Sequence, residues 1–143
     1  MVHGGGSMAR AAAGQTHETV EKHSKLFRDM ILGFVRVHVL YHASKEPIYG
    51  SGISAELETH GYRLSWGTLF PLLHSLESEG FLVRDERVIN GKVRKYYEIT
   101  DLGRTALEEA RRKALELVDE IMEVDLLKAV DRGGHGRRGV KPA

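Results

Sequence analysis

A short helix near the middle of the chain is predicted by its apolar positions. They recur at spacings of three and four and so share one helix face: Leu69, Leu72, Leu73 and Leu76. Ser65 is a residue type that caps helix N-termini through its hydroxyl, and Gly80 can adopt the left-handed conformation that ends a helix. We therefore expect a helix of about fifteen residues with one buried stripe.

A two-stranded hairpin is expected directly after this helix. Residues 81–89 run into Asn90-Gly91, a strong two-residue turn signal because both positions tolerate a positive φ, and residues 92–100 return as the second strand. Between Arg87 and Lys95 there are four basic residues and no acid. Cations at a hairpin tip are well placed for phosphates. The alternative is that they only keep an exposed strand edge soluble and unpaired.

Before the central helix, the pattern predicts a longer helix from Ser24 to Ser44. Apolar residues cover most of its circumference, so it must be buried on more than one side. A domain this small covers only one side, which predicts a partner subunit on the other. The residues expected at that interface are Phe27, Met30 and Phe34.

A helix-turn-helix pair is expected between these two helices. Pro47 ends the first helix within a turn over residues 45–52. A short helix from Ile53 to His60, the break at Gly61 and the helix after Ser65 then form the pair.

A heptad pattern marks the last helix, which Asp101 can cap at its N-terminus. Its apolar residues are spaced by 3, 4, 3, 4 and 3: Leu107, Ala110, Ala114, Leu117, Ile121 and Val124. We expect a long C-terminal dimerisation helix over residues 101–127. The alternative, a helix folded onto its own domain, fits less well because a helix of 24 residues spans about 36 Å, longer than the body it would cover.

Three linked segments resemble the PadR-type transcriptional regulators. Residues 61–71 read Gly-Tyr-Arg-Leu-Ser-Trp-Gly-Thr-Leu-Phe-Pro, where that family has a Gly-Tyr pair before Ser-Pro-Gly-Thr-Leu-Tyr-Pro. Residues 76–82 read Leu-Glu-Ser-Glu-Gly-Phe-Leu and are similar to its Leu-Glu-x-x-Gly-Leu-Leu. Residues 91–103 resemble its Gly-x-x-Arg-Lys-Tyr-Tyr-x-Leu-Thr-x-x-Gly, with Ile99 in place of the Leu. The resemblance implies a winged helix-turn-helix homodimer that represses transcription and is often released by a small effector. The chain departs at Trp66, where the family usually has Pro, and at Phe70, where it usually has Tyr.

The expected fold is therefore mainly α with a small β-wing (α+β), a winged helix-turn-helix with a long C-terminal dimerisation helix. The expected divisions are a flexible tail over 1–15, a DNA-binding domain over 16–100, the dimerisation helix over 101–127 and a basic disordered tail over 128–143. The homodimer would place two copies of the Ser65 helix in successive major grooves of a palindromic double-stranded operator.

Individual residues can be assigned to DNA contacts on this basis. Ser65 and Thr68 would hold phosphate at the helix N-terminus, and Gly67 would let the backbone approach closely. The candidates for base-edge or sugar contact are Arg63, Trp66 and His74. The cations expected to supply phosphate contacts from the wing are Lys92, Arg94 and Lys95. Trp66 could equally pack under the wing or line an effector pocket.

Composition limits the other functions. The chain has 143 residues, no cysteine and a net charge of +1. It contains no nucleophile elbow, phosphate loop or His-Glu-x-x-His motif, so we expect no enzyme activity and no cofactor. No apolar run approaches about twenty residues, so we expect a cytoplasmic protein without a membrane span. The rival hypothesis is a dimeric protein-interaction module that uses the same scaffold without binding DNA.

One pair of side chains could bind a metal. His38 and His42 lie four residues apart on one helix face, a spacing that can hold a transition metal between two imidazoles. A tetrahedral site needs a third ligand, for which Glu21 or Glu120 are candidates. Packed, hydrogen-bonded histidines are the commoner arrangement, so no metal is the expectation.

Overall fold

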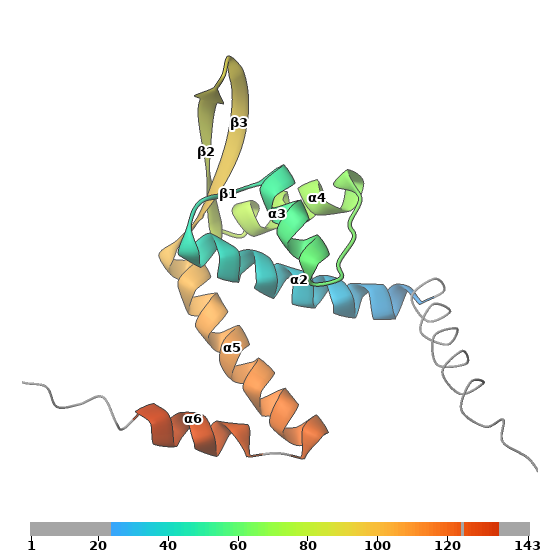
Figure 1. Cartoon of the computed structure of the whole chain (residues 1–143), viewed down its shortest axis with the longest axis vertical. Helices are drawn as coiled ribbons and strands as arrows, with labels where there is room; N and C mark the ends of the chain where they lie inside the picture. Colours follow the sequence, from blue (N-terminus) through green and yellow to red (C-terminus); the bar gives the residue numbers. More distant parts are fainter. Residues whose placement is uncertain (1–23, 124, 135–143) are drawn as a thin grey trace, which may run out of the picture.

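The structure is a computed structural model that describes residues 24–123 and 125–134. The described elements in chain order are α2 (Lys25–Lys45), β1 (Ile48–Tyr49), α3 (Gly50–Thr59), α4 (Trp66–Ser78), β2 (Leu82–Ile89), β3 (Lys92–Ile99), α5 (Asp101–Met122) and α6 (Leu126–Gly134). Figure 1 shows α2, α3 and α4 gathered in one body, with the β2–β3 hairpin projecting from one end and α5 from the other. The expected class, mainly α with a small antiparallel wing, is confirmed.

The first described helix, α2, begins where the sequence predicts. Ser24 is its N-cap, and the Ser24 hydroxyl accepts a hydrogen bond from the Phe27 backbone N–H at 3.1 Å. The buried residues lie in its C-terminal half, which packs in the body: Val35, Val39, Leu40 and Ala43. The N-terminal half extends beyond the body and leaves Leu26 and Met30 exposed.

Residues 45–52, expected as a turn, also contain a strand. Ile48 and Tyr49 pair antiparallel with Tyr97 and Tyr96, so the hairpin becomes a three-stranded sheet in the order β1-β3-β2. Two residues are too few to produce a periodic pattern, so the sequence alone does not reveal β1. Helix α3 follows at once and begins at Gly50, before the expected Ile53.

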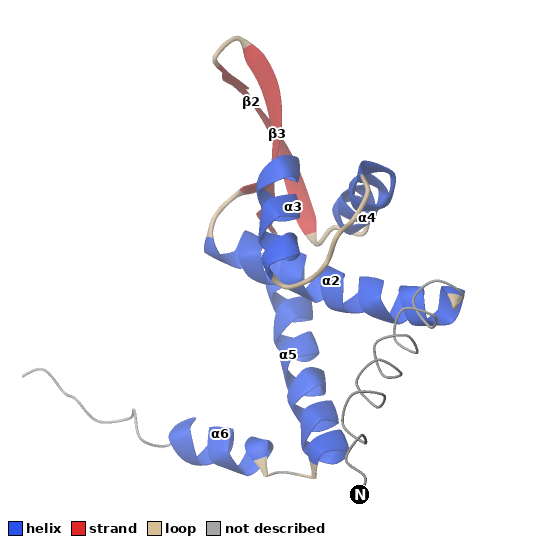
Figure 2. Ribbon diagram, turned by 45° about the vertical axis from the view of Figure 1, so that its right-hand side comes forward, coloured by secondary structure: helices blue, strands red, loops and turns tan. Residues whose placement is uncertain are grey.

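The hairpin itself forms as predicted. Ile89 pairs with Lys92 across a two-residue turn, and Asn90 and Gly91 have φ angles of 52° and 75°. These positive values are what an Asn-Gly turn accommodates at low cost. In Figure 2 the two strands form a long ribbon that reaches well past α3 and α4.

A single hydrophobic core holds the body together. It joins residues from α2, α3, α4, the sheet and the first turns of α5. Leu107, which the heptad pattern assigns to the dimerisation seam, belongs to this core and is only 5% exposed in the single chain. It also lines the groove between α2 and α5. Its place in a dimer interface stays a prediction.

The C-terminal region differs from the expectation in its boundaries. Helix α5 begins after Thr100, whose hydroxyl accepts from the Gly103 N–H at 3.0 Å; Thr100 therefore caps it rather than Asp101. It ends at Met122, and a second helix, α6, follows. The Asp119 carboxylate caps α6 by accepting hydrogen bonds from the backbone N–H groups of Leu126 and Leu127. Residues 128–134 are thus helical, which corrects the expected tail over that stretch.

Several expectations fall outside the described residues. These are the flexible tail over 1–15, the basic segment from 135 onward and Val124 of the predicted seam. None of the helices within the described ranges is long and apolar enough to cross a membrane.

Candidate nucleic-acid interface

The turn between α3 and α4 is fixed by backbone hydrogen bonds at the end of α3. Gly61 has a φ of +87°, and its N–H donates to the Glu58 carbonyl oxygen at 3.0 Å. The Tyr62 N–H donates to the Leu57 carbonyl oxygen at 2.9 Å. This is the bonding pattern that commonly ends a helix at a left-handed glycine. It ends α3 and begins the short turn that leads into α4.

Helix α4 is held by its buried stripe, as the sequence predicts. Its buried residues are the four expected leucines: Leu69, Leu72, Leu73 and Leu76. At its C-terminus Gly80 has a φ of +83°, and the Phe81 N–H donates to the Leu76 carbonyl oxygen at 2.9 Å. The helix therefore leads directly into β2, with only the turn at Gly80 between them.

The N-terminus of α4 carries a cluster of hydroxyls and one arginine. The Ser65 backbone carbonyl accepts from Thr68 and Leu69, but the Ser65 hydroxyl makes no capping bond to the backbone. It lies instead 3.2 Å from the Thr68 hydroxyl, which accepts from Arg28 Nη2 at 3.1 Å. Ser65 is thus the N-cap by position only, which corrects the expected side-chain cap. Arg28, forty residues earlier on α2, adds a positive charge to this end of α4.

The exposed face of α4 is aromatic rather than charged. Trp66, Phe70 and His74 follow one another at intervals of four residues, so they share one side of the helix. The Trp66 and Phe70 rings stack with centroids 5.2 Å apart, and each side chain remains 49% exposed. His74 Nδ1 lies 4.0 Å from a Glu77 carboxylate oxygen. The sequence of α4 contains no Lys or Arg, so cations for phosphate must come from neighbouring elements.

Gly67 and Arg63 are two further predicted contact residues near the start of α4. Gly67 is exposed, and a Cβ built on it would meet only the Ser65 hydroxyl, 3.9 Å away. Arg63, in the turn before α4, is exposed and lies 3.5 Å from a Glu58 carboxylate oxygen. Trp66 and Phe70 both lie against Gly50 at the start of α3, since a Cβ there would come within 3.6 Å and 3.2 Å of their rings.

The wing cations differ in how strongly they are restrained. Arg87 pairs with Asp85 at 3.1 Å and with Glu98 at 3.2 Å, and its guanidinium lies 4.5 Å from the Tyr96 ring centroid. Arg94 lies 4.4 Å over the Tyr49 ring of β1. Both arginines are therefore oriented by the protein.

The two wing lysines are exposed and lie on different faces of the ribbon. Neither Lys92 nor Lys95 forms an ion pair with any described residue. Side chains alternate along a strand, so Lys92 shares a face with Arg94, whereas Lys95 lies on the other face. That second face also carries Arg84, which lies 3.7 Å from Glu77 of α4. Lys95 therefore projects from the α4 side of the wing, and the three predicted wing cations do not form a single patch.

The expected dimerisation residues surround an apolar groove between α2 and α5. The groove has a volume of about 750 Å³, and α6 contributes Leu126 to its lining. Of the predicted residues, five line it: Met30, Phe34, Leu107, Ala114 and Leu117. Ile121, one turn further along α5, is 64% exposed, and Phe27 is half-buried on α2.

Sequence reasoning missed three residues near these sites. Arg28 reaches Thr68, the Tyr49 ring lies under Arg94, and His60 lies beside His38 and His42. Each is brought to its site by tertiary contacts between distant segments, so no local pattern marks it. Only α6 had a local signal, because Leu126, Leu127 and Val130 recur at helical spacing.

Comparison with known proteins gives a consistent result. Residues 39–109 match the sequence model of the "Transcriptional regulator PadR-like family". The chain is 47% identical to "Transcriptional regulator Rv3488" of Mycobacterium tuberculosis over 88 residues, which cover 62% of this chain and 82% of that protein.

Solved structures agree with the fold. A PadR-like transcription factor from Bacteroides fragilis superimposes with a TM-score of 0.62 at 27% identity, covering 71% of this chain and 100% of the other. A PadR-like transcriptional regulator from Bacillus cereus superimposes with a TM-score of 0.58 at 30% identity, covering 68% of this chain and 99% of the other.

Proposed function

The chain belongs to the PadR-like family of transcriptional regulators and is a DNA-binding regulator, not an enzyme, and from this premise we propose that it is a homodimeric repressor acting in the cytoplasm. It would bind a palindromic operator and leave it when a small effector binds. The observation that carries this proposal is the arrangement of α4: one face is packed in the core, and an exposed side of the helix presents Trp66, Phe70 and His74 beside a basic ribbon.

The exposed face of α4 fits the major groove by chemistry. Its aromatic pair can contact thymine methyl groups and sugars, and His74 can hydrogen-bond to a base edge. Gly67 leaves room for the sugar-phosphate backbone beside the first turn. Because α4 has no Lys or Arg, we propose that it contributes selectivity and that Arg63, together with the surrounding cations, contributes affinity.

Phosphate contacts would come from both ends of this surface. Ser65, Thr68 and Arg28 form a donor cluster at the α4 N-terminus, where the helix dipole also favours an anion. Lys92 and Lys95 extend from the wing without ion-pair partners among the described residues, so they retain their charge for phosphates. Arg94, placed over Tyr49, would join Lys92 on one wing face.

A second copy of the chain would cover the apolar groove. Met30, Phe34, Leu117 and Ile121 are large, apolar and exposed in the single chain. Burying a side chain of this size contributes about 1.5 to 3 kcal/mol, so covering four from each copy is a substantial driving force. Two α4 helices held by one such interface can reach two half-sites about one helical turn apart.

The groove is also where we propose that the small effector acts. The groove lies between α2 and α5. Helix α2 packs directly against the helix-turn-helix, and α5 carries much of the exposed apolar surface. A ligand that changed the angle between α2 and α5 would change the spacing of the two α4 helices in the dimer. Operator affinity would then change without any contact between effector and DNA.

The direct test is selection of bound duplexes from random DNA, read out by sequencing. A repressor of this kind enriches two-fold symmetric sites whose halves lie about one helical turn apart. The rival function, a protein-interaction module that uses the same scaffold, predicts no enrichment and no binding to any duplex even at low salt.

A further inference from the structure

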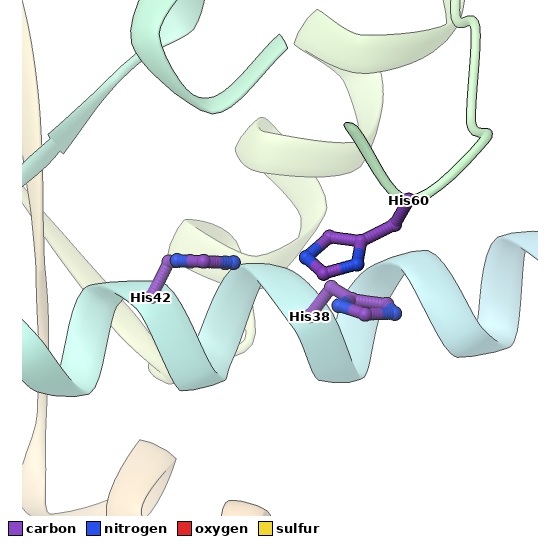
Figure 3. A group of neighbouring side chains, drawn as sticks. All are labelled: His38, His42 and His60. Atoms are coloured by element: carbon purple, nitrogen blue, oxygen red, sulfur yellow. The ribbon is translucent and has the colours of Figure 1, made fainter. Parts of the chain in front are cut away.

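Three histidines from two separate segments meet at the edge of the α2–α5 groove. His38 and His42 come from α2, and His60 is the residue that follows α3. Each offers one ring nitrogen, and these three atoms all lie within 4.8 Å of one another. Figure 3 shows the His60 ring lying over His38, with His42 one helical turn away on the same side of α2. His60 thus occupies the third position for which the sequence offered only Glu21 or Glu120.

The packing of these rings leaves one of their nitrogens without a hydrogen bond. His42 Nε2 is buried and has no hydrogen-bond partner among the described residues. A buried polar atom of this kind normally has a partner in a native protein, so its exception calls for an explanation. A bound ion would satisfy its lone pair.

The surroundings of His38 favour its neutral form. Burial lowers the pKa of His38 from its ordinary value, and the neighbouring His60 and His42 lower it further. A neutral imidazole has a free lone pair, whereas a protonated one must first release its proton to bind a metal. The cations that line the groove, Arg111 and Lys113, are paired with Glu108 at 2.7 Å and Glu116 at 3.8 Å. Their charges are thereby partly compensated.

We propose that His38, His42 and His60 form a binding site for a divalent transition metal of the zinc class. Imidazole nitrogens suit Zn²⁺, Cu²⁺ and Ni²⁺, and three protein ligands leave one position for water or a fourth donor. Nitrogen ligands of tetrahedral Zn²⁺ lie about 3.3 Å apart, given metal–nitrogen distances of about 2.0 Å. The histidine nitrogens, which lie within 4.8 Å of one another, therefore need to move closer by up to about 1.5 Å, which the exposed His60 side chain can do by rotating.

A metal at this position would link α2 to the helix-turn-helix. His60 directly precedes Gly61, whose turn leads into α4, while His38 and His42 lie on the helix that lines the proposed dimer groove. The ion would restrain the turn relative to α2 and so change the population of DNA-binding geometries. This consequence rests on the proposed function. The metal site itself does not.

The site is tested by treating the full chain with a chelator and then measuring Zn²⁺ binding by titration calorimetry. Absorption spectra of the Co²⁺-loaded chain are a second measurement. Binding should saturate at about one ion per chain, and His60→Gln and His38→Gln should each weaken it by about tenfold or more. His135→Gln, which lies outside the described residues, is the matched control and should leave binding unchanged. Thermal unfolding of each variant confirms that it is folded.

Two results would overturn the site. One is Zn²⁺ affinity unchanged in both His60→Gln and His38→Gln. The other is loss of binding in His135→Gln with full binding in His60→Gln, which would place the metal elsewhere in the chain.

DNA binding by the metal-free wild type, measured by fluorescence anisotropy, tests the proposed function separately. If that binding occurs, Zn²⁺ should change the affinity about fivefold or more in the wild type and not in His60→Gln. Zinc binding without any DNA binding would contradict only the repressor function. Zinc binding that leaves DNA affinity unaltered would contradict the link between the metal and α4.

Discussion

Gly103 packs so closely against Phe81 that a Cβ built on it would overlap the Phe81 carbonyl oxygen and lie 3.1 Å from the carbonyl carbon. This packing joins the first turn of α5 to the start of the wing. Thr100 reinforces it, because its hydroxyl donates to the Gly80 carbonyl oxygen at 2.5 Å and accepts from the Gly103 N–H at 3.0 Å. The end of α4, the base of the wing and the start of α5 are therefore held together in one tightly packed junction.

The first prediction concerns this junction. Gly103→Ala should lower the free energy of unfolding by about 1 to 3 kcal/mol or more, since backbone and not a flexible side chain opposes the new methyl group. Urea or thermal unfolding followed by circular dichroism measures the effect. Gly133→Ala on α6, where a Cβ meets nothing within 4 Å, is the control and should not be destabilised. Equal stability of the Gly103→Ala protein and the wild type would mean that the junction is not tightly packed.

The second prediction concerns the wing. Replacing Lys92, Arg94 and Lys95 together by Ala should weaken binding to every DNA sequence. The slope of log affinity against log salt should become shallower by about two to three units per wing, because each phosphate that the wing neutralises adds about 0.9 unit to it. A triple Ala variant of Arg112, Lys128 and Arg132, all exposed on α5 and α6, removes equal charge far from the wing. An unchanged slope in the wing variant would mean that the wing does not bind DNA.

The third prediction concerns readout by α4. Trp66 is half-exposed and stacks on Phe70, so Trp66→Ala should change stability little. If Trp66 contacts bases, affinity for the selected operator should fall by about 1 to 3 kcal/mol while binding to random duplex is retained. Competition anisotropy with the two DNAs measures the ratio, and Trp66→Phe should keep part of the preference. An equal decrease in affinity for both DNAs would assign Trp66 to general positioning.

The fourth prediction concerns assembly. Ile121 is exposed in the single chain, so Ile121→Asp should leave the fold intact but place an uncompensated charge in the proposed dimer interface. Sedimentation velocity at micromolar concentration should show a wild-type dimer and a monomeric variant that retains weak, non-specific DNA affinity.

Arg112→Asp is the matched control for assembly, because residues nine apart lie on opposite sides of a helix. It should remain a dimer. An Ile121→Asp protein that stays dimeric would show that α5 does not carry the interface. Truncation after Ala106 is a poorer test, since it removes Leu107 from the chain's own core and would unfold the monomer as well.

Local chemistry in the sequence was sufficient to predict the main elements. The leucines of α4, the Asn90-Gly91 turn and the left-handed Gly80 were all predicted correctly, since each depends on residues within one or two turns of chain. The apolar α2 was predicted for the same reason. The motifs around these elements were also enough to indicate the PadR-like family and, with it, DNA binding.

Contacts between distant segments were decided only by the tertiary structure. The heptad pattern grouped Leu107 with Ile121, yet Leu107 lies in the chain's own core while Ile121 faces solvent. Arg28 reaches Thr68, and His60 joins the two histidines of α2, across separations at which no periodicity operates. Periodicity specifies which residues share a helix face, but the surface that covers that face depends on how the whole chain packs.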